Sequence, residues 1–440
     1  MRLHHGLLGH AEALLAELLT FAGPADQAVS RYFRHHHQLG QGDRAIVAET
    51  VYTVLRRRRS LEQAAGSAAP RALLLAVLVR MQGLSGRELE GRLRGNEPHL
   101  IARLKEARLE AMPQAVQADL PDWLWQRLAA EQGEAEAMRI AQGLLGPAPL
   151  DLRVNLARIG REAVLERLLA GGVVGAPTAL SPAGVRLEGK PAINRHKLFE
   201  EGLVEVQDEG SQLLAYLVAP RRGEMVADFC AGAGGKTLAL AMLMRGTGRV
   251  YAMDVSARRL HALAPRASRA GILSVHPIAL SGENDPRLKR LVGKLDRVLV
   301  DAPCSGLGTL RRNPDLKWRH GPEALNELAA KQLRILVSAA RLVKPGGRLV
   351  YATCSLLKEE NEAVVERFVA AHAEFGSLSC GALLAAQRIP LEAGAQLRLW
   401  PHLHATDGFF AAAFERHQRQ GLPGSSALRG DAFSVKRARR

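Results

Sequence analysis

The sequence has few cysteines, and none is spaced like a metal or redox site. Cys230, Cys304, Cys354 and Cys380 are the four among 440 residues. Zinc sites and thioredoxin-like sites use Cys-x-x-Cys pairs, and disulfide scaffolds contain far more cysteine. We therefore expect no metal site and no disulfide framework, but free thiols in a reducing cytoplasm. Cys230 and Cys380 are interpreted as small buried apolar side chains.

Long apolar runs and an excess of acidic residues are also missing. The longest run, residues 72–79, is far shorter than the roughly 18 residues that span a bilayer. The start of the chain lacks the basic, apolar and small-residue succession of a secretory signal. Lys and Arg number 60 against 44 Asp and Glu, a net charge of +16. We expect a monomeric cytoplasmic protein without membrane contact, whose partner is a polyanion such as RNA.

The length allows two or three domains, and the apolar patterns divide the chain. Helical periodicity at 7–19 and 46–55, and the nearly all-apolar segment 73–78, predict a helical bundle. After Pro149 the pattern changes, with strands expected at 152–156 and 185–187 and a helix at 161–170. The predicted regions are an all-α RNA-binding domain at 1–140, a small α+β cap at 141–215, a catalytic α/β domain at 216–420 and a disordered basic tail at 421–440.

Basic residues gather at two places where RNA could bind. Residues 56–59 are four consecutive arginines at an expected helix end, a dense positive spot that can contact phosphates. Residues 310–319 combine several basic residues with Trp318, which suits phosphates and a stacked base. The alternatives are a solvated face for the arginines and a packing role for Trp318.

A glycine-rich turn follows the predicted strand 225–230 and precedes a predicted helix. Such a turn lets the backbone approach a ligand, and the helix N-terminus adds N–H donors. A P-loop would need Gly at position 230, and a dinucleotide fingerprint Gly or Ala at position 237, where the chain has Cys230 and Thr237. We therefore expect a nucleoside ligand with little or no phosphate. The residues expected to line its site are Cys230, Ala231, Gly232, Ala233, Gly234, Gly235 and Lys236.

Asp254 ends the next predicted strand, which begins at Arg249. A carboxylate there can accept hydrogen bonds from both hydroxyls of a ribose, and it would repel a phosphate on that ribose. The alternative role is a helix cap, which Ser256 could fill instead. S-adenosylmethionine is a nucleoside ligand without phosphate, so it fits both the glycine loop and Asp254.

Two cysteines fall at the ends of predicted strands. Residues 296–301 predict a buried strand that enters a loop containing Cys304. A turn at 344–347 and an apolar run up to Thr353 predict a second strand, which ends at Cys354. Because ligands gather at the carboxyl ends of parallel strands, both thiols can face one pocket.

Four segments in the second half of the chain occur in a characteristic order. They are Asp228-Phe-Cys-Ala-Gly-Ala-Gly-Gly-Lys236, Asp254-Val-Ser256, Asp301-Ala-Pro-Cys304-Ser-Gly306 and Tyr351-Ala-Thr-Cys354-Ser355. Together they resemble the motif series of the RNA 5-methylcytosine methyltransferases of the NOL/NOP/Sun family, over about residues 200–416. The helical pattern near residues 42–56 resembles NusB, and this layout is similar to the small-subunit rRNA enzymes of the family. The resemblance implies an α/β fold, with a Rossmann-like SAM-dependent methyltransferase sheet, an all-α NusB-like N-terminal domain and a small α+β cap.

The resemblance also implies a role for each catalytic residue. Cys354 would add to C6 of cytosine, which makes C5 able to attack the methyl group of the cofactor. Asp301 would line the cofactor site and hydrogen-bond or protonate the base at N3. Lys236 would orient Asp301 and favour a nearby thiolate. Cys304 would assist the release of the product.

Members of the family usually carry an acid after the third strand, near the adenine and ribose. The family pattern fits this part of the sequence at more than one position. Glu283, Asn284 and Asp285 are the candidates, and the sequence does not choose among them.

The residues and the resemblance together predict an RNA cytosine-C5 methyltransferase that uses S-adenosylmethionine. The expected substrate is 16S rRNA, free or in an early small-subunit particle. The same chemistry on tRNA is one alternative, and a noncatalytic RNA-binding assembly factor with a vestigial site is another. A DNA cytosine methyltransferase would use the Pro-Cys cysteine, Cys304, as the nucleophile and would not need Cys354.

Overall fold

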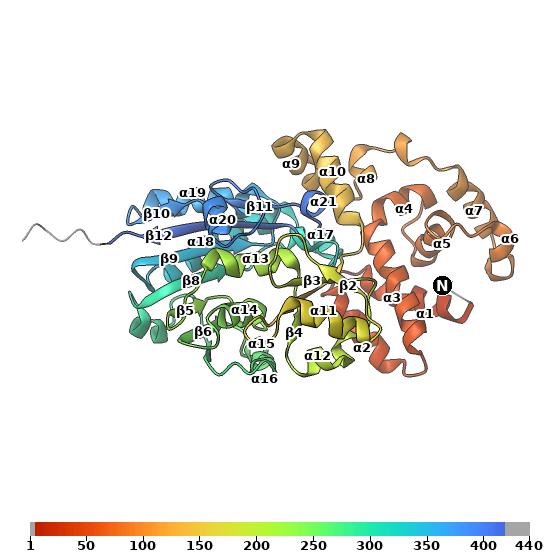
Figure 1. The fold of residues 1–440 in the computed structure, drawn as a ribbon. Helices are drawn as coiled ribbons and strands as arrows, with labels where there is room; N and C mark the ends of the chain where they lie inside the picture. Colours follow the sequence, from red (N-terminus) through yellow and green to blue (C-terminus); the bar gives the residue numbers. More distant parts are fainter. Residues whose placement is uncertain (1–4, 419–440) are drawn as a thin grey trace, which may run out of the picture.

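The computed structural model describes residues 5–418 and shows three regions that follow one another along the chain (Figure 1). A helical region lies at one end of the molecule, a large sheet at the other, and a small sheet between them. No helix within residues 5–418 is long and apolar enough to cross a membrane. The tail predicted at 421–440 lies outside the described residues.

The N-terminal helices up to residue 106 pack around one apolar core, and the helices that follow bury their apolar residues in a second cluster. The predicted faces of the first and third helices are buried, with Leu14, Leu15, Val51 and Leu55 inaccessible to solvent. Residues 73–78 are buried on every side of their helix, as expected for the central member of a bundle. The helices of this region are α1 (His5–Leu18), α2 (Ala25–His35), α3 (Gln41–Arg56), α4 (Arg58–Ala65), α5 (Pro70–Arg80), α6 (Gly86–Leu89), α7 (Glu97–Glu106), α8 (Gln114–Gln117), α9 (Asp122–Gln132) and α10 (Glu134–Leu145).

A four-stranded antiparallel sheet of order β2-β3-β1-β4 follows. Val164 and Leu168 from one helix pack on Leu152, Val185 and their neighbours in this sheet. The strands and the helix predicted between 152 and 187 are confirmed, within two residues at each strand end. The elements are β1 (Leu150–Val154), α11 (Arg161–Ala170), β2 (Gly175–Pro177), β3 (Gly184–Leu187), α12 (Lys197–Glu200) and β4 (Val204–Val206).

The large sheet has the strand order β10-β12-β9-β8-β5-β6-β7, with β11 paired to β12. Strands β5 to β9 are parallel, and β12 is antiparallel to β9. This is the predicted Rossmann-like arrangement. Its elements are α13 (Glu209–Val218), β5 (Met225–Asp228), α14 (Gly235–Leu243), β6 (Arg249–Asp254), α15 (Ala257–His261), α16 (Leu263–Arg269), β7 (Val275–Ala279), β8 (Leu295–Asp301), α17 (Leu316–Arg319), α18 (Pro322–Ala340), β9 (Val343–Thr353), α19 (Glu362–Ala371), β10 (Phe375–Leu378), α20 (Cys380–Ala386), β11 (Leu397–Leu399), α21 (Pro401–His404) and β12 (Phe409–Arg416).

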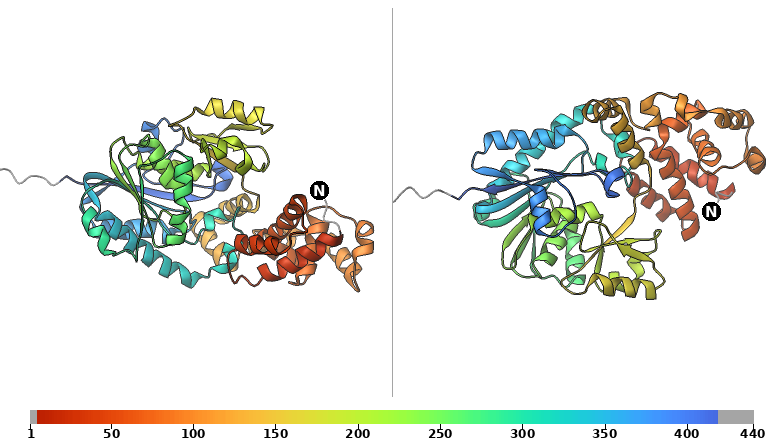
Figure 2. Two further views of the ribbon diagram at one scale, coloured as in Figure 1. Left: turned by 90° about the horizontal axis from the view of Figure 1, so that it is seen from below. Right: turned by 45° about the horizontal axis from the view of Figure 1, so that its top comes forward.

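Helices cover both faces of the large sheet (Figure 2). Alternate strand residues such as Val350 and Ala352 share one core with α13, α14 and α20. The intervening residues, such as Leu349 and Tyr351, share the opposite core with α18 and α19. Both faces of each central strand are therefore apolar, which explains the continuous apolar runs in the sequence.

The turn predicted at 344–347 is wrong, because strand β9 runs through it. Leu295 pairs with Val343, but Arg297 already pairs with Arg348, so β9 bulges outward between these two pairs. Gly346 makes the bulge possible, since its φ of +74° is costly for other residues. The strand still ends at Thr353, as predicted.

Helices α9 and α10 pack against the large-sheet region. Leu128 and Ile140 share an apolar cluster with Leu310, Leu357 and Trp400. This cluster joins the first region of the chain to the last, and it places α10 beside α21 (Figure 1).

The predicted phosphate-binding spot at residues 56–59 is wrong for Arg56. Only 7% of Arg56 is exposed, and its guanidinium lies 3.2 Å from the Glu49 carboxylate. Arg58 and Arg59 pair with carboxylates of the same region. These arginines are therefore engaged within the protein.

Residues 310–319 contact the N-terminal helices as well. Lys317 is 2% exposed, and its Nζ donates to the backbone oxygens of Arg56 and Asp119 at 2.6 and 2.7 Å. Burial lowers the pKa of Lys317 to about 8. Trp318 Nε1 donates to Leu55 O at 3.0 Å. This contact favours a packing role for Trp318.

Candidate active site

The candidate site lies at the carboxyl ends of the parallel strands, beside β5. Strand β5 has β6 on one side and β8 on the other. The strands that follow β5 in the sequence are thus added first on one side of it and then on the other. Such a change of direction leaves a crevice where ligands bind. A cavity of about 480 Å³ lies there, a size typical of small-molecule sites. The predicted site residues that line it are Cys230, Ala231, Gly232, Ala233, Gly235, Lys236, Asp254, Asp301, Cys304 and Cys354.

The glycine loop leaves room for a ligand against its backbone. A Cβ at Gly235 would meet no atom within 4 Å, so the start of α14 is open to the cavity. Gly234 does not line the cavity. Its φ is +87°, and a Cβ there would lie 2.2 Å from the Leu263 side chain, so it is needed for the turn itself. The loop therefore fits a ligand held by close backbone approach.

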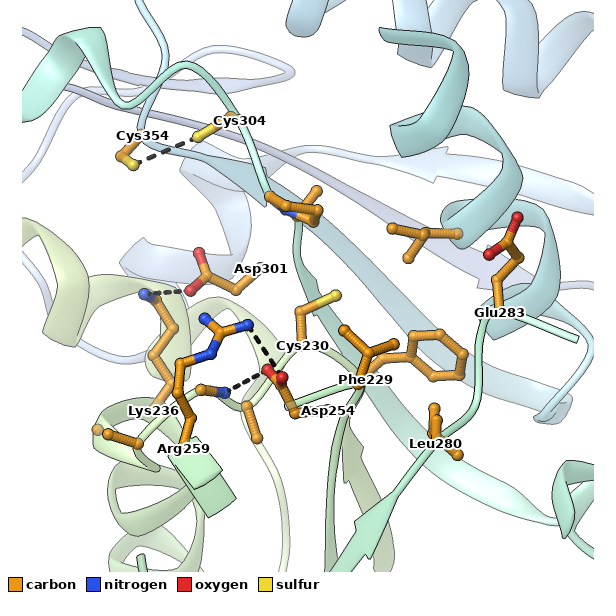
Figure 3. Close-up of a pocket in the computed structure, with 18 of the residues that line it drawn as sticks. Phe229, Cys230, Lys236, Asp254, Arg259, Leu280, Glu283, Asp301, Cys304 and Cys354 are labelled. Atoms are coloured by element: carbon orange, nitrogen blue, oxygen red, sulfur yellow. Dashed lines mark hydrogen bonds and ion pairs between the residues drawn. The ribbon is translucent and has the colours of Figure 1, made fainter. Parts of the chain in front are cut away.

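Asp254 lies at the end of β6, and its carboxylate accepts hydrogen bonds from the glycine loop and from the residues that follow β6. One carboxylate oxygen accepts from Gly232 N at 2.9 Å, and the other accepts from Ser256 N at 2.7 Å and from Arg259 Nη2 at 2.9 Å. Ser256 Oγ accepts from Arg259 N and caps α15, as the sequence suggested. Asp254 is thus not required as the cap, and its carboxylate lines the cavity instead (Figure 3).

The two predicted thiols lie together at one end of this cavity (Figure 3). The Sγ atoms of Cys304 and Cys354 are 3.3 Å apart. Hydrogen bonding to the Cys354 sulfur, together with burial, raises the pKa of the Cys304 thiol well above its ordinary value. Cys304 therefore stays a thiol at ordinary pH.

Lys236 and Asp301 form an ion pair between the glycine loop and the thiols. Lys236 Nζ lies 2.7 Å from Asp301 Oδ2. Burial lowers the pKa of Lys236, but the Asp301 carboxylate outweighs it and raises that pKa above the ordinary value. The predicted contact between the two residues is confirmed, and it keeps a positive charge near Cys354.

Beneath the loop, the carboxyl group of Asp228 is completely buried. Its Oδ2 accepts from Thr237 Oγ1 at 2.7 Å, and its Oδ1 has no partner within residues 5–418. Burial raises the pKa of Asp228 to about 7.

An Asp228→Asn variant should become more stable relative to the wild type as pH rises from about 4 to 7. The folded carboxyl binds its proton up to about pH 7, whereas the unfolded one loses it near its ordinary pKa. Ionisation of this carboxyl in the unfolded state, while the folded state keeps its proton, therefore lowers the stability of the wild type over this window by up to about 4 kcal/mol. Thermal unfolding of both proteins across this range measures the difference. If the unfolding temperatures of the two proteins changed with pH in parallel, the raised pKa of Asp228 would be contradicted.

Of the three residues proposed after the third strand, Glu283 lines the cavity. It lies with Phe229 and Leu280 at the end opposite the thiols (Figure 3). Asp285 instead accepts from Ser281 N and pairs with Arg287 within its own loop.

Two further lining residues, Gln207 and Ser211, were not predicted. They precede the large sheet, and Gln207 Nε2 donates to Ser211 Oγ at 3.0 Å. No motif marks them in the sequence, because they reach the cavity only through the packing of α13 beside the glycine loop.

The comparisons with known proteins agree with this geometry. Residues 215–415 match the model of the 16S rRNA methyltransferase RsmB/F family, and residues 120–194 match the ferredoxin-like domain of RsmF/B-like methyltransferases. The probable ribosomal RNA small subunit methyltransferase B of Synechocystis sp. is 33% identical over 425 residues, which are 89% of this chain and 95% of that protein. The chain belongs to the RsmB/F family of 16S rRNA methyltransferases.

Solved structures show that the fold of this RsmB/F-family chain is shared along almost its whole length. The crystal structure of the protein PH0851 superposes with a TM-score of 0.76 at 27% identity, covering 94% of this chain and 98% of that one. A methyltransferase homologue from Pyrococcus horikoshii has a TM-score of 0.59 at 30% identity, covering 69% and 97%.

Proposed function

We propose that this RsmB/F-family chain methylates C5 of a cytosine in small-subunit rRNA through a covalent bond between Cys354 and C6 of the base. The observation that best supports this reaction is the thiol pair, 3.3 Å apart, at one end of the cavity. The glycine loop and Asp254 line the same cavity. One pocket thus holds groups suited to a nucleoside cofactor and two groups suited to one base.

The cofactor we propose is S-adenosylmethionine, which when bound supplies an electrophilic methyl group. The open backbone at Gly235 and the donors of the α14 N-terminus would hold its polar parts. The carboxylate of Asp254 would accept from its ribose hydroxyls. Glu283, with Leu280 and Phe229 beside it, would border the adenine end.

An Asp254→Ala variant should bind S-adenosylmethionine roughly 10- to 100-fold more weakly, because hydrogen bonds to a charged group contribute about 1.5–3 kcal/mol. Asp285→Ala is the matched control, since its carboxylate is equally buried and also closes a loop at a strand end, but it lies outside the cavity. Calorimetry measures both affinities. A folded Asp254→Ala protein with wild-type affinity would remove Asp254 from the cofactor site.

Cys354 begins the proposed reaction. Cytosine C5 is a weak nucleophile, so the Cys354 thiolate adds to C6 and its electron pair moves through the ring to C5, which then takes the methyl group. The ion pair of Lys236 and Asp301, on the cavity wall, provides a hydrogen-bonding partner for N3 while charge passes through the ring. The Cys354 sulfur is then a neutral thioether.

Cys304 completes the proposed reaction. The proton on C5 must leave before the Cys354–C6 bond can break. The contact with the Cys354 sulfur that raises the pKa of Cys304 weakens when Cys354 becomes a thioether, so Cys304 can lose its proton to solvent and, as a thiolate, accept the proton from C5. The electrons of the C5–H bond form the C5–C6 double bond, and Cys354 leaves as a thiolate.

Bisulfite mapping tests the function, since 5-methylcytosine resists conversion to uracil. Deleting the gene should abolish resistance at a cytosine of 16S rRNA, and the wild-type gene, but not Cys354→Ala, should restore it. Loss of bisulfite resistance at a tRNA cytosine instead would identify tRNA, and not 16S rRNA, as the substrate. No change in any RNA would favour a noncatalytic assembly factor and overturn the proposal.

A further inference from the structure

Beneath the two thiols lies a buried carboxylate that no step above uses. Glu360, in the short 3-10 helix η6 (Lys358–Glu360), has no solvent exposure. Within residues 5–418 it forms no ion pair with a basic side chain, although burying an unpaired charge is costly. It is surrounded instead by hydrogen-bond donors, which offset that cost.

The donors come from the residues that directly follow the two cysteines. Ser305 donates to Glu360 through both its backbone N, at 2.8 Å, and its Oγ, at 2.5 Å. Ser355 donates through its Oγ to the same carboxylate. The two serine Oγ atoms are 3.2 Å apart, and both serines are buried. One carboxylate therefore joins the Cys304 loop to the Cys354 loop.

Neighbouring side chains hold the remaining backbone around each cysteine. Gln332 Nε2 donates to Pro303 O, just before Cys304, and to Glu360 Oε1, both at 3.0 Å. Asn361 Nδ2 donates to Ser355 O at 3.1 Å. The network therefore reaches both sides of Cys304 and the far side of Cys354, and Glu360 lies at its centre.

We propose that Glu360 is a positioning residue that sets the separation of the Cys304 and Cys354 thiols by clamping the serine after each. Its role in catalysis rests on the proposed function. There, two sulfur atoms act on C5 and C6, which are neighbouring atoms of one ring, so the sulfur atoms must be held close together. A change of about 1 Å in such an arrangement can cost roughly 100-fold in rate.

The chemistry of a carboxylate suits this clamp. Two ionised oxygens offer about four acceptor sites, whereas an amide has a single acceptor oxygen and a group that only donates. Glu360→Gln should therefore keep the shape but loosen one loop, and Glu360→Ala should release both. The separation of the two thiols should therefore increase from the wild type to Glu360→Gln, and again to Glu360→Ala.

Disulfide formation measures the thiol separation without any substrate. The oxidant diamide takes two electrons and two protons from a close thiol pair, which becomes a disulfide while the diazene becomes a hydrazine. The Cys304–Cys354 disulfide, identified by peptide mass mapping, should form at least tenfold more slowly in Glu360→Ala than in the wild type, with Glu360→Gln between them. Single-turnover methyl transfer should fall in the same order, while affinity for S-adenosylmethionine stays unchanged.

Asp119→Asn is the matched control. Asp119 is an equally buried carboxylate that accepts from the backbone N and Oγ of Ser60, but it lies among the N-terminal helices. It should leave the rate of disulfide formation unchanged. A slowing of the same size in Asp119→Asn would mean general destabilisation and would overturn the clamp.

The other outcomes are also decisive. Wild-type disulfide rates in folded Glu360→Ala and Glu360→Gln would overturn the proposal. If Glu360→Ala does not fold, Glu360→Gln carries the same test. A slowed disulfide in the variants, together with a wild type that methylates no RNA, would support the clamp and reject the proposed function.

Discussion

A Cys354→Ala variant should lose methyl transfer by about a thousandfold or more and should form no covalent complex with RNA. The Cys354 sulfur provides the bond to C6 on which every later step depends, and alanine cannot form it. The cavity and the glycine loop do not depend on this side chain, so cofactor affinity should stay at the wild-type level. Methyl incorporation from labelled cofactor, a denaturing gel and calorimetry measure the three quantities.

The arrangement of the thiols supports Cys354 rather than Cys304 as the nucleophile. A thiolate is the reactive form of cysteine. Cys304 is held as a thiol by its contact with the Cys354 sulfur and by burial, and the nearby Glu360 carboxylate adds to this effect. The positive charge of Lys236, whose own pKa is raised partly by Cys354, lies on the other side of the pair. Cys304 is therefore a poor source of thiolate.

Cys380→Ala is the control for this variant. Cys380 is a fully buried free cysteine in a core cluster, and it does not line the cavity. Its replacement should therefore affect stability alone. The assignment would be reversed if Cys354→Ala still formed the covalent complex and Cys304→Ala did not.

Local patterns in the sequence predicted which side chains lie together at one edge of the sheet. Apolar runs that end at Asp254, Asp301 and Thr353 predicted buried strands, and the carboxyl ends of these parallel strands meet at one edge of the sheet. The glycine loop has its own local signature. These patterns set the positions of the ligand loop and the two thiols before any long-range contact is known.

Contacts between distant segments were not predictable in this way. Lys317 binds the backbone of Arg56, which is 261 positions away, and nothing near either residue shows that they are partners. A basic residue in a sequence therefore looks the same whether it binds RNA or a buried carbonyl. Glu360 was missed for a related reason, since its role depends on two serines from different strand ends.

A Cys304→Ala variant should form the covalent complex with RNA but fail to release it. The variant keeps Cys354, so addition to C6 and methyl transfer can proceed. The C5 proton then has no acceptor, and the Cys354–C6 bond cannot break. Loss of a positioned base typically slows such a step by roughly 100- to 10,000-fold, so the complex should accumulate.

The methyl group shows at which step the complex is trapped. With labelled RNA and, separately, labelled S-adenosylmethionine, a denaturing gel of Cys304→Ala should show a slow band that carries both labels. The Cys304→Ala/Cys354→Ala double variant should show no band, because the bond to C6 requires Cys354. A band with RNA label alone would mean that Cys304 acts before methyl transfer. Full turnover by Cys304→Ala without any band would show that another group accepts the C5 proton, and Asp301, which lines the same cavity, would then be a candidate.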